Sequence, residues 1–245
     1  MIPEAVALAL AEKESKRKGA SDHFRMSSLG HCPRKQVAMR AGLEPTTPSD
    51  DRGYFKMWMG TVLGKNIQAL LEGQGFLDPS WTEREVKYRS YVGHLDGLTR
   101  KLPGTDEYGP AVVELKSTAD ASVTKYDWPE HYQWQAFGYC LGANTSRALL
   151  YQFGREYGID REKIILLTPE WRTKLDDEIA WVEACYDLWV KTKELPPCKH
   201  RFKWEDKTCS YREAKEVKAE KAAWNPHMQT ETDRELSEFL DKEKT

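Results

Sequence analysis

The chain has 245 residues, of which 40% are hydrophobic and 31% are charged, and this composition is typical of a folded globular protein rather than a disordered one. Its net charge of −2 excludes a strongly basic protein, although a neutral body can still hold a basic groove. No apolar run approaches the ~20 residues that span a bilayer, and the chain does not begin with the apolar core of a signal peptide. Its five cysteines do not make the dense disulfide framework of a small secreted protein. We therefore expect a cytoplasmic protein that contacts no membrane.

Helices are expected in the N-terminal third. Residues 3–18 are rich in Ala, Leu, Glu and Lys, which favour helix. Pro33 fits the first turn of a short basic helix, because its missing N–H is not needed there. Residues 44–52 are rich in Pro, Thr, Ser and Asp and indicate a loop. A second helix is expected over residues 53–75, ending near two glycines.

Strands are expected in the middle of the chain. Residues 81–99 alternate polar and apolar side chains, and residues 111–117 form a short apolar run that contains Glu and Lys. A turn signal at residues 103–106 predicts that these two segments are neighbouring antiparallel strands. Residues 147–153 and 163–168 are expected to be two further strands of a hairpin.

Two helices separate and follow these strands. The first is expected over residues 128–142, with Asp127 as its N-cap and Gly142 near its end. The second begins at Thr168-Pro169, keeps a 3.6-residue apolar period, and is stopped by Pro196-Pro197. The order of these elements predicts an α/β fold with a central mixed β-sheet flanked by helices.

Charged residues interrupt the apolar strand at residues 111–117. Glu114 and Lys116 are two residues apart and share one face of the strand, whereas Val113 and Leu115 are expected to point into the core. Burying an unpaired charge is costly, so the two charges need a reason. The simplest alternative is a Glu–Lys pair on a half-exposed edge strand.

A third charged residue, Asp96, follows a Gly-His-Leu turn on the preceding strand, where strand pairing would bring it beside Glu114. Two carboxylates repel each other unless a cation lies between them, and oxygen ligands suit Mg²⁺ or Mn²⁺. Such an ion polarises a phosphodiester and activates a bound water. Lys116 would then position the water or neutralise charge on the phosphate.

Polar side chains recur at every fourth residue of the following helix, at His131, Gln135 and Tyr139, and form one stripe. Taken by itself, this stripe is also what an exposed amphipathic helix would show. Its place directly after the strand that carries Glu114 and Lys116 favours a functional site.

This set of motifs resembles the core of the PD-(D/E)XK nuclease superfamily, and more narrowly its RecB-like branch, which includes CRISPR-adaptation nucleases and many phage exonucleases. The residues that carry the resemblance are Asp96, the Glu114-Leu115-Lys116 triplet and Gln135-x-x-x-Tyr139. The resemblance extends from about residue 26 to residue 211. It implies a restriction-endonuclease-like core and DNA as the substrate.

The resemblance also implies a role for each motif position. Asp96 and Glu114 would be metal ligands, with the backbone carbonyl of Leu115 as a third, and Lys116 would be the catalytic lysine. The Gln-x-x-x-Tyr pair, Gln135 and Tyr139, would lie near the DNA backbone.

One position departs from the branch. Its usual Gly-x-x-x-His pattern, whose histidine is a further metal ligand, corresponds here to Gly60-Thr61-Val62-Leu63-Gly64. His94 lies on the same strand face as Asp96 and is an alternative source of nitrogen, although a neighbour without metal contact is the favoured interpretation. The glycine at 64 raises the question of how active the site is and how many metals it binds.

Some relatives bind an iron–sulfur cluster with one cysteine before the nuclease core and three after it. Cys32 resembles the N-terminal member of that set, and Cys198 and Cys209 lie at the matching end of the chain, after the long helix. The usual C-terminal Cys-x-x-Cys pair is absent. The alternatives are a [4Fe–4S] cluster, tetrahedral Zn²⁺, or thiols without metal. Cys140 and Cys185 are expected to be buried core thiols. The candidate cluster or zinc ligands are Cys32, Cys198, His200 and Cys209.

The favoured function is a metal-dependent DNA nuclease, an exonuclease acting on ends or single strands in recombination, repair or phage DNA processing. The alternatives are a structure-specific endonuclease, and a weakened nuclease fold that serves as a DNA-binding or interaction module. Residues 1–211 would form one nuclease domain that the cysteine segments close, and residues 212–245 a charged tail. Trp58 or Trp204 would be suited to stack on an unpaired base.

Overall fold

The structure is a computed structural model. Its described residues are 20–46, 51–102, 108–124, 127–155, 158–202, 204–205 and 209–211. The helix predicted over residues 3–18 and the tail predicted over 212–245 lie outside the described residues.

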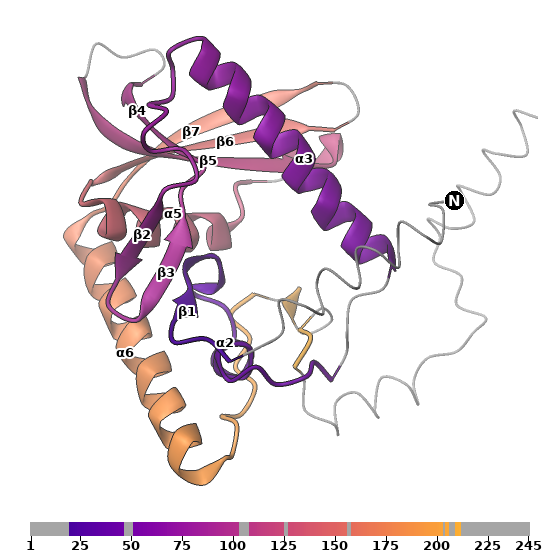
Figure 1. The fold of residues 1–245 in the computed structure, drawn as a ribbon, viewed down its shortest axis with the longest axis vertical. Coiled ribbons are helices and arrows are strands. Elements are labelled where there is room, and N and C mark those ends of the chain that lie inside the picture. Colours follow the sequence, from indigo (N-terminus) through magenta and orange to yellow (C-terminus); the bar gives the residue numbers. More distant parts are fainter. Residues whose placement is uncertain are drawn as a thin grey trace, which may run out of the picture. The chain divides into compact units, whose positions relative to one another are not determined.

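A four-stranded mixed sheet forms the centre of the fold (Figure 1), with strand order β4-β5-β6-β7. Strand β5 pairs antiparallel with β4 and parallel with β6, and β6 pairs antiparallel with β7. The predicted α/β class, the antiparallel neighbour of residues 111–117 and the later hairpin are therefore confirmed. The strands are β4 (Gly97–Lys101), β5 (Tyr108–Thr118), β6 (Arg147–Gly154) and β7 (Asp160–Leu166).

A second sheet has the order β1-β3-β2, with β1 (Phe24–Arg25), β2 (Glu85–Tyr88) and β3 (Tyr91–His94). The alternating segment 81–99, expected to be one strand region, is thus divided over β2, β3 and β4. Arg89 adopts a left-handed backbone (φ 51°), which closes the tight turn between β2 and β3. Beyond the end of β3, Leu95 is still bonded to the loop before β2, donating its N–H to the Arg84 carbonyl at 3.0 Å, and the chain enters β4 two residues later.

The helices differ from the sequence predictions mainly at their ends. The short helices are η1 (Met26–Ser28), α2 (Pro33–Arg40) and α4 (Asp120–Thr124), and the long ones are α3 (Asp51–Gly73), α5 (Glu130–Ala143) and α6 (Pro169–Thr192). The prediction of Asp127 as the N-cap of α5 was wrong, and the N-cap is Pro129. The cause is that a proline disfavours helical backbone in the residue before it, so the helix cannot begin at Trp128. The helix ends at Ala143 with Asn144 as its left-handed C-cap, so Gly142 lies near the end of the helix, as predicted. Thr168 caps α6 by accepting a hydrogen bond from the Trp171 N–H.

Each face of the four-stranded sheet has its own hydrophobic cluster, as the alternation of strand side chains requires. Val113 and Leu115 pack on the face that carries apolar residues of α3, such as Leu63 and Ile67. Val112 packs on the opposite face, among residues of α5 and α6. Because side chains alternate along β5, Glu114 and Lys116 belong to the α5 face, which confirms the predicted separation from Val113 and Leu115.

No helix in the described ranges is both long enough and apolar enough to cross a bilayer.

Candidate active site

The two carboxylates predicted as metal ligands meet where β3 passes into β4. Gly97 pairs with Val113, so Asp96 lies opposite Glu114 in the antiparallel register. The Asp96 Oδ2 atom accepts a hydrogen bond from the Leu115 N–H at 2.7 Å. On α3, Gln68 donates its Nε2 hydrogen to the Asp96 backbone carbonyl at 2.9 Å, a contact that the sequence analysis missed.

Glu114 is an ionisable group buried in the core, with 1% of its surface exposed. Its Oε1 forms an ion pair with the Lys116 ammonium. Its Oε2 is buried and accepts no hydrogen bond from any residue that the structure describes. Burial raises the pKa of Glu114 in spite of the attraction of Lys116. A buried carboxylate with an open oxygen, beside a second carboxylate, is the arrangement that a divalent cation satisfies.

Asp96 shows the same electrostatic tension. Burial, and then repulsion from the charge of Glu114, raise its pKa from 3.8 to about 7. Lys116 and the Leu115 N–H act in the opposite direction but do not cancel these effects. At neutral pH without a divalent cation, the two carboxylates therefore compete for one proton and one lysine.

This tension predicts a pH dependence of stability for the protein in buffer free of Mg²⁺ and Mn²⁺. The folded-state pKa of Asp96 (about 7) lies above its unfolded value (3.8), so the folded protein binds this proton more tightly. The stabilisation is complete below the unfolded pKa and is lost as pH rises through about 7. Urea unfolding between about pH 5 and pH 8 should show this fall, and Asp96→Asn should flatten it. An Asp96→Asn profile as steep as that of the wild type would contradict the assignment.

Lys116 is held by the predicted Gln-x-x-x-Tyr pair of α5. Its Nζ donates a hydrogen bond to Gln135 Oε1 at 3.1 Å, and Gln135 Nε2 donates to the Tyr139 hydroxyl at 3.4 Å. Burial lowers the pKa of Lys116, but the charges of Glu114 and Asp96 outweigh it and leave the pKa raised. Burial, and then Glu114, raise the pKa of Tyr139. The site thus presents an ammonium ion oriented by a neutral amide and a neutral phenol.

The third member of the predicted stripe, His131, is not among these contacts of Lys116. Its ring lies against Tyr132, with centroids 4.3 Å apart, and against Trp204 at 5.2 Å. Burial, followed by the electrostatic effects of His31 and Lys116, lowers the pKa of His131 to about 4, so the His131 ring is neutral at pH 7. Tyr132, which the sequence analysis did not select, has its ring centroid 5.4 Å from the Lys116 Nζ.

Gly64, where the Gly-x-x-x-His pattern would have its histidine, lies on the face of α3 that is turned toward the sheet. A Cβ on Gly60 would come within 3.2 Å of the Ser117 Oγ on β5, and Gln68 reaches Asp96 two helical turns later. Gly64 lies between them at the same helical spacing, and a Cβ there would meet nothing within 4 Å. His94 is exposed, and its Nε2 lies 3.8 Å from a carboxylate oxygen of Glu85.

Three of the four predicted cysteine-site residues meet. Ligand atoms of Cys32, His200 and Cys209 all lie within 4.8 Å of one another. The fourth, Cys198, is not in this group, and its Sγ lies 3.9 Å from the Tyr211 carbonyl. A hydrogen bond from Cys209 lowers the pKa of the Cys32 thiol to about 5, against the effect of burial. Cys140 and Cys185 are buried free thiols, as predicted.

A buried glutamate that the sequence analysis missed ties the two ends of this cysteine site together. Glu205 accepts hydrogen bonds from the His31 Nδ1 at 2.8 Å and the Cys32 N–H at 3.2 Å. It also accepts from the backbone N–H groups of Arg201 and Phe202, at 3.2 and 3.3 Å. One carboxylate thus fixes residues 31–32 against the segment that carries His200.

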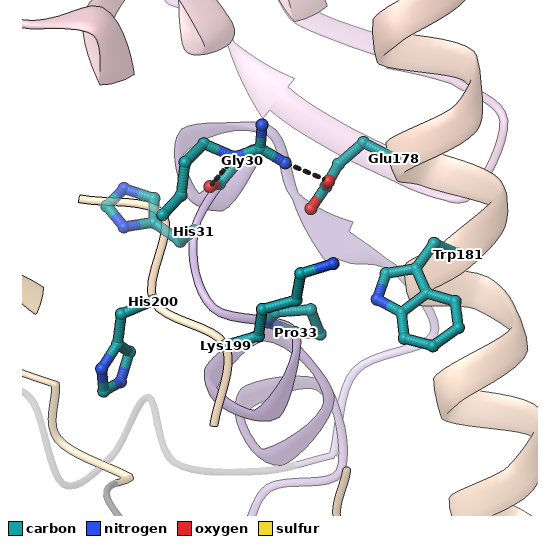
Figure 2. Close-up of a pocket in the computed structure, with 8 residues that line it drawn as sticks. Gly30, His31, Pro33, Glu178, Trp181, Lys199 and His200 are labelled. Atoms are coloured by element: carbon teal, nitrogen blue, oxygen red, sulfur yellow. Dashed lines mark hydrogen bonds and ion pairs between the residues drawn. The ribbon is translucent and has the colours of Figure 1, made fainter. Parts of the chain in front are cut away.

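A cavity of about 220 Å³ opens beside this junction (Figure 2). Arg201 forms one wall by donating to the Gly30 carbonyl at 3.2 Å and pairing with Glu178 on α6. Lys199 lies beside the Trp181 ring, with its Nζ 5.8 Å from the ring centroid.

The comparisons with known proteins place the chain by fold. No family model matches it, and no curated protein matches it. The crystal structure of SSO0001 aligns with 85% of this chain and 93% of its own at a TM-score of 0.52 and 16% identity. An alkaline exonuclease from Laribacter hongkongensis (LHK-Exo) aligns with 74% of this chain and 97% of its own, at a TM-score of 0.48 and 11% identity. Its complex with dAMP aligns with 75% and 98%, at 0.44 and 14%. At these identities, the likeness to SSO0001 is a likeness of fold.

Proposed function

We propose that this chain is a metal-dependent DNA nuclease that hydrolyses phosphodiester bonds, acting as an exonuclease on ends or single strands. The observation that carries the proposal is Glu114, a buried carboxylate with an open oxygen, beside Asp96 and in contact with Lys116. Recombination, repair and phage DNA processing are the settings in which such an activity is used.

The donor set fits a hard divalent cation. The carboxylates of Asp96 and Glu114 and the backbone carbonyl of Leu115 would hold Mg²⁺ or Mn²⁺, which prefer oxygen ligands. When bound, the ion supplies polarisation of the phosphodiester and a lowered pKa for a coordinated water. It would also offset the repulsion between the two carboxylates, which accounts for their placement in a buried site.

The protein's own contribution centres on Lys116. Its ammonium stays charged at neutral pH, because the neighbouring carboxylates raise its pKa. It can therefore neutralise charge that develops on a phosphate oxygen and orient the attacking water. Gln135 fixes the direction of the ammonium, and the Tyr139 hydroxyl fixes the amide of Gln135.

A cleavage assay with Mn²⁺ or Mg²⁺ tests the proposal on two substrates, linear DNA labelled at one end and supercoiled circular DNA. We expect the linear DNA to be degraded and the circle to stay intact. Cutting of the circle would instead support the structure-specific endonuclease. If neither DNA is cut with either metal, the nuclease proposal fails and the DNA-binding module is favoured.

The binding-module alternative depends on Gly64, and a gain-of-function variant addresses it. Gly64→His should supply a nitrogen ligand, since the position has room for a side chain. We expect the Mn²⁺ concentration for half-maximal cleavage to fall about tenfold, the lower end of what supporting groups of a metal site contribute. Gly73→His is the matched control, because Gly73 is on the same helix and is equally open. Equal effects of both variants would contradict a ligand role at position 64.

We also propose that Cys32, His200 and Cys209, with Cys198 as the fourth ligand, hold a structural metal that closes a domain of residues 1–211, with residues 212–245 as its charged tail. Two thiols and an imidazole within 4.8 Å suit tetrahedral zinc, and a [4Fe–4S] cluster is the alternative. The lowered pKa of Cys32 supports a thiolate at neutral pH.

Metal content and colour distinguish these cases. We expect a colourless protein with stoichiometric zinc, and loss of that zinc in Cys209→Ser with a lower melting temperature. The buried Cys185, changed to Ala, is the control and should keep its zinc. A brown protein that contains iron would select the [4Fe–4S] alternative, and a metal-free wild type would overturn the site.

A further inference from the structure

A row of three aromatic rings leads away from the catalytic lysine. The Lys116 Nζ lies 5.4 Å from the ring centroid of Tyr132. The Tyr132 ring contacts His131 at 4.3 Å, and His131 contacts Trp204 at 5.2 Å. We call Tyr132, His131 and Trp204 the aromatic row. Two of its members belong to α5, and the third comes from the C-terminal segment, more than seventy residues away in the sequence.

The outer end of the row is exposed and firmly supported. Trp204 has 42% of its surface exposed. Its ring stacks on the buried Phe202, with centroids 5.9 Å apart and planes 2° apart, and meets the edge of His31 at 5.5 Å. Glu205, the next residue, is buried and bonded to His31. A flat apolar surface is therefore held in one orientation and presented to solvent.

Flat, uncharged rings beside a cation match the chemistry of single-stranded DNA, whose unpaired bases stack on aromatic side chains while basic groups contact the backbone. Duplex DNA does not offer this surface, because its bases are stacked inside the helix. We propose that the aromatic row binds unstacked bases of a single-stranded DNA segment whose neighbouring phosphate lies at Lys116. This inference deepens the proposed function and rests on it for the role of Lys116.

Another exposed tryptophan provides a matched control. Trp58 on α3 is 40% exposed, close to the value for Trp204. Its ring contact within the described residues is with Phe55 of the same helix, at 5.7 Å, and not with the aromatic row. The two tryptophans are therefore alike in exposure and differ in their connection to Lys116.

The test is equilibrium binding of fluorescent oligo-dT, followed by anisotropy with Ca²⁺ in place of Mg²⁺. We expect Trp204→Ala to raise the Kd at least about fivefold, the effect of one lost base–aromatic stack. Trp204→Phe should restore most of the affinity, and Trp58→Ala should leave the Kd unchanged. A strand with abasic sites in place of its bases should bind the wild type and Trp204→Ala equally. Trp204→Leu, which keeps apolar bulk without a ring, replaces the Ala variant if that one unfolds.

Two outcomes would overturn the aromatic row as a base-binding surface. One is wild-type affinity in Trp204→Ala and Trp204→Leu, and the other is an equal loss in Trp58→Ala. Cleavage by the wild type, measured separately with Mn²⁺, keeps the two proposals apart. If the wild type cuts DNA while Trp204 has no effect on binding, only the aromatic row is wrong. If Trp204 governs binding while the wild type does not cut, only the nuclease is wrong.

Discussion

A Glu114→Gln variant is expected to lose phosphodiester cleavage by on the order of 10³-fold while it keeps the wild-type fold, which is the scale reached when a group that stabilises transition-state charge is removed. Glutamine has the shape of glutamate but lacks the negative charge that a divalent cation requires. The raised pKa of Glu114 shows that the folded state favours its uncharged form. Lys116 would keep its hydrogen bond to Gln135 and the nearby charge of Asp96, so a neutral amide at position 114 should leave the melting temperature in metal-free buffer unchanged or raised.

Cleavage of end-labelled DNA and thermal unfolding, measured on the same preparations, check both halves of this prediction. Glu162→Gln is the matched control, because Glu162 lies on β7 and is exposed, so the same chemical change should leave cleavage intact. Cleavage by Glu114→Gln at the wild-type rate would remove the basis of the proposed site. Loss of cleavage together with unfolding would show that Glu114 has a structural role instead.

The parts of this site that sequence could predict follow from local rules. The alternation along β5 determines that Glu114 shares a face with Lys116 and not with Val113, whatever the rest of the chain does. The antiparallel hairpin determines that Asp96 arrives opposite Glu114. The spacing of four along α5 determines that Gln135 lies next to Tyr139. Each of these inferences required only that a segment be recognised as a strand or a helix, together with the element that precedes or follows it in the sequence.

The parts that sequence could not predict depend on contacts between distant segments. Glu205 and His31 are 174 residues apart and belong to no repeating pattern, so nothing local indicates that one carboxylate joins them. Gln68 donates to the backbone carbonyl of Asp96. Because every residue has a backbone carbonyl, the sequence does not indicate which one Gln68 contacts. The N-cap of α5 failed for a different reason, because the conformational restriction before Pro129 overrode the capping preference of Asp127.

The second large effect is expected from Lys116→Met, which removes the counter-charge and leaves the carboxylates in place. Breaking a buried ion pair costs ~3–5 kcal/mol, and because the Lys116 side chain is 22% exposed we expect the lower end of this range, ~3 kcal/mol. The cost should be largest in metal-free buffer near pH 8 and smaller near pH 5, because Asp96, whose pKa is raised to about 7, is protonated at the lower pH, and burial shifts the pKa of Glu114 in the same direction.

A double-mutant cycle with Glu114→Gln isolates the electrostatic part of that cost. If the penalty comes from an uncompensated Glu114 charge, the double variant should recover most of the stability that Lys116→Met loses, and the two changes will not be additive. Added Mg²⁺ should stabilise Lys116→Met more than the double variant, because a cation replaces the lost ammonium only where the carboxylate remains. Strict additivity, with equal Mg²⁺ responses, would show that Lys116 acts through packing, and the proposed catalytic role of Glu114 and Lys116 would then lose its electrostatic basis.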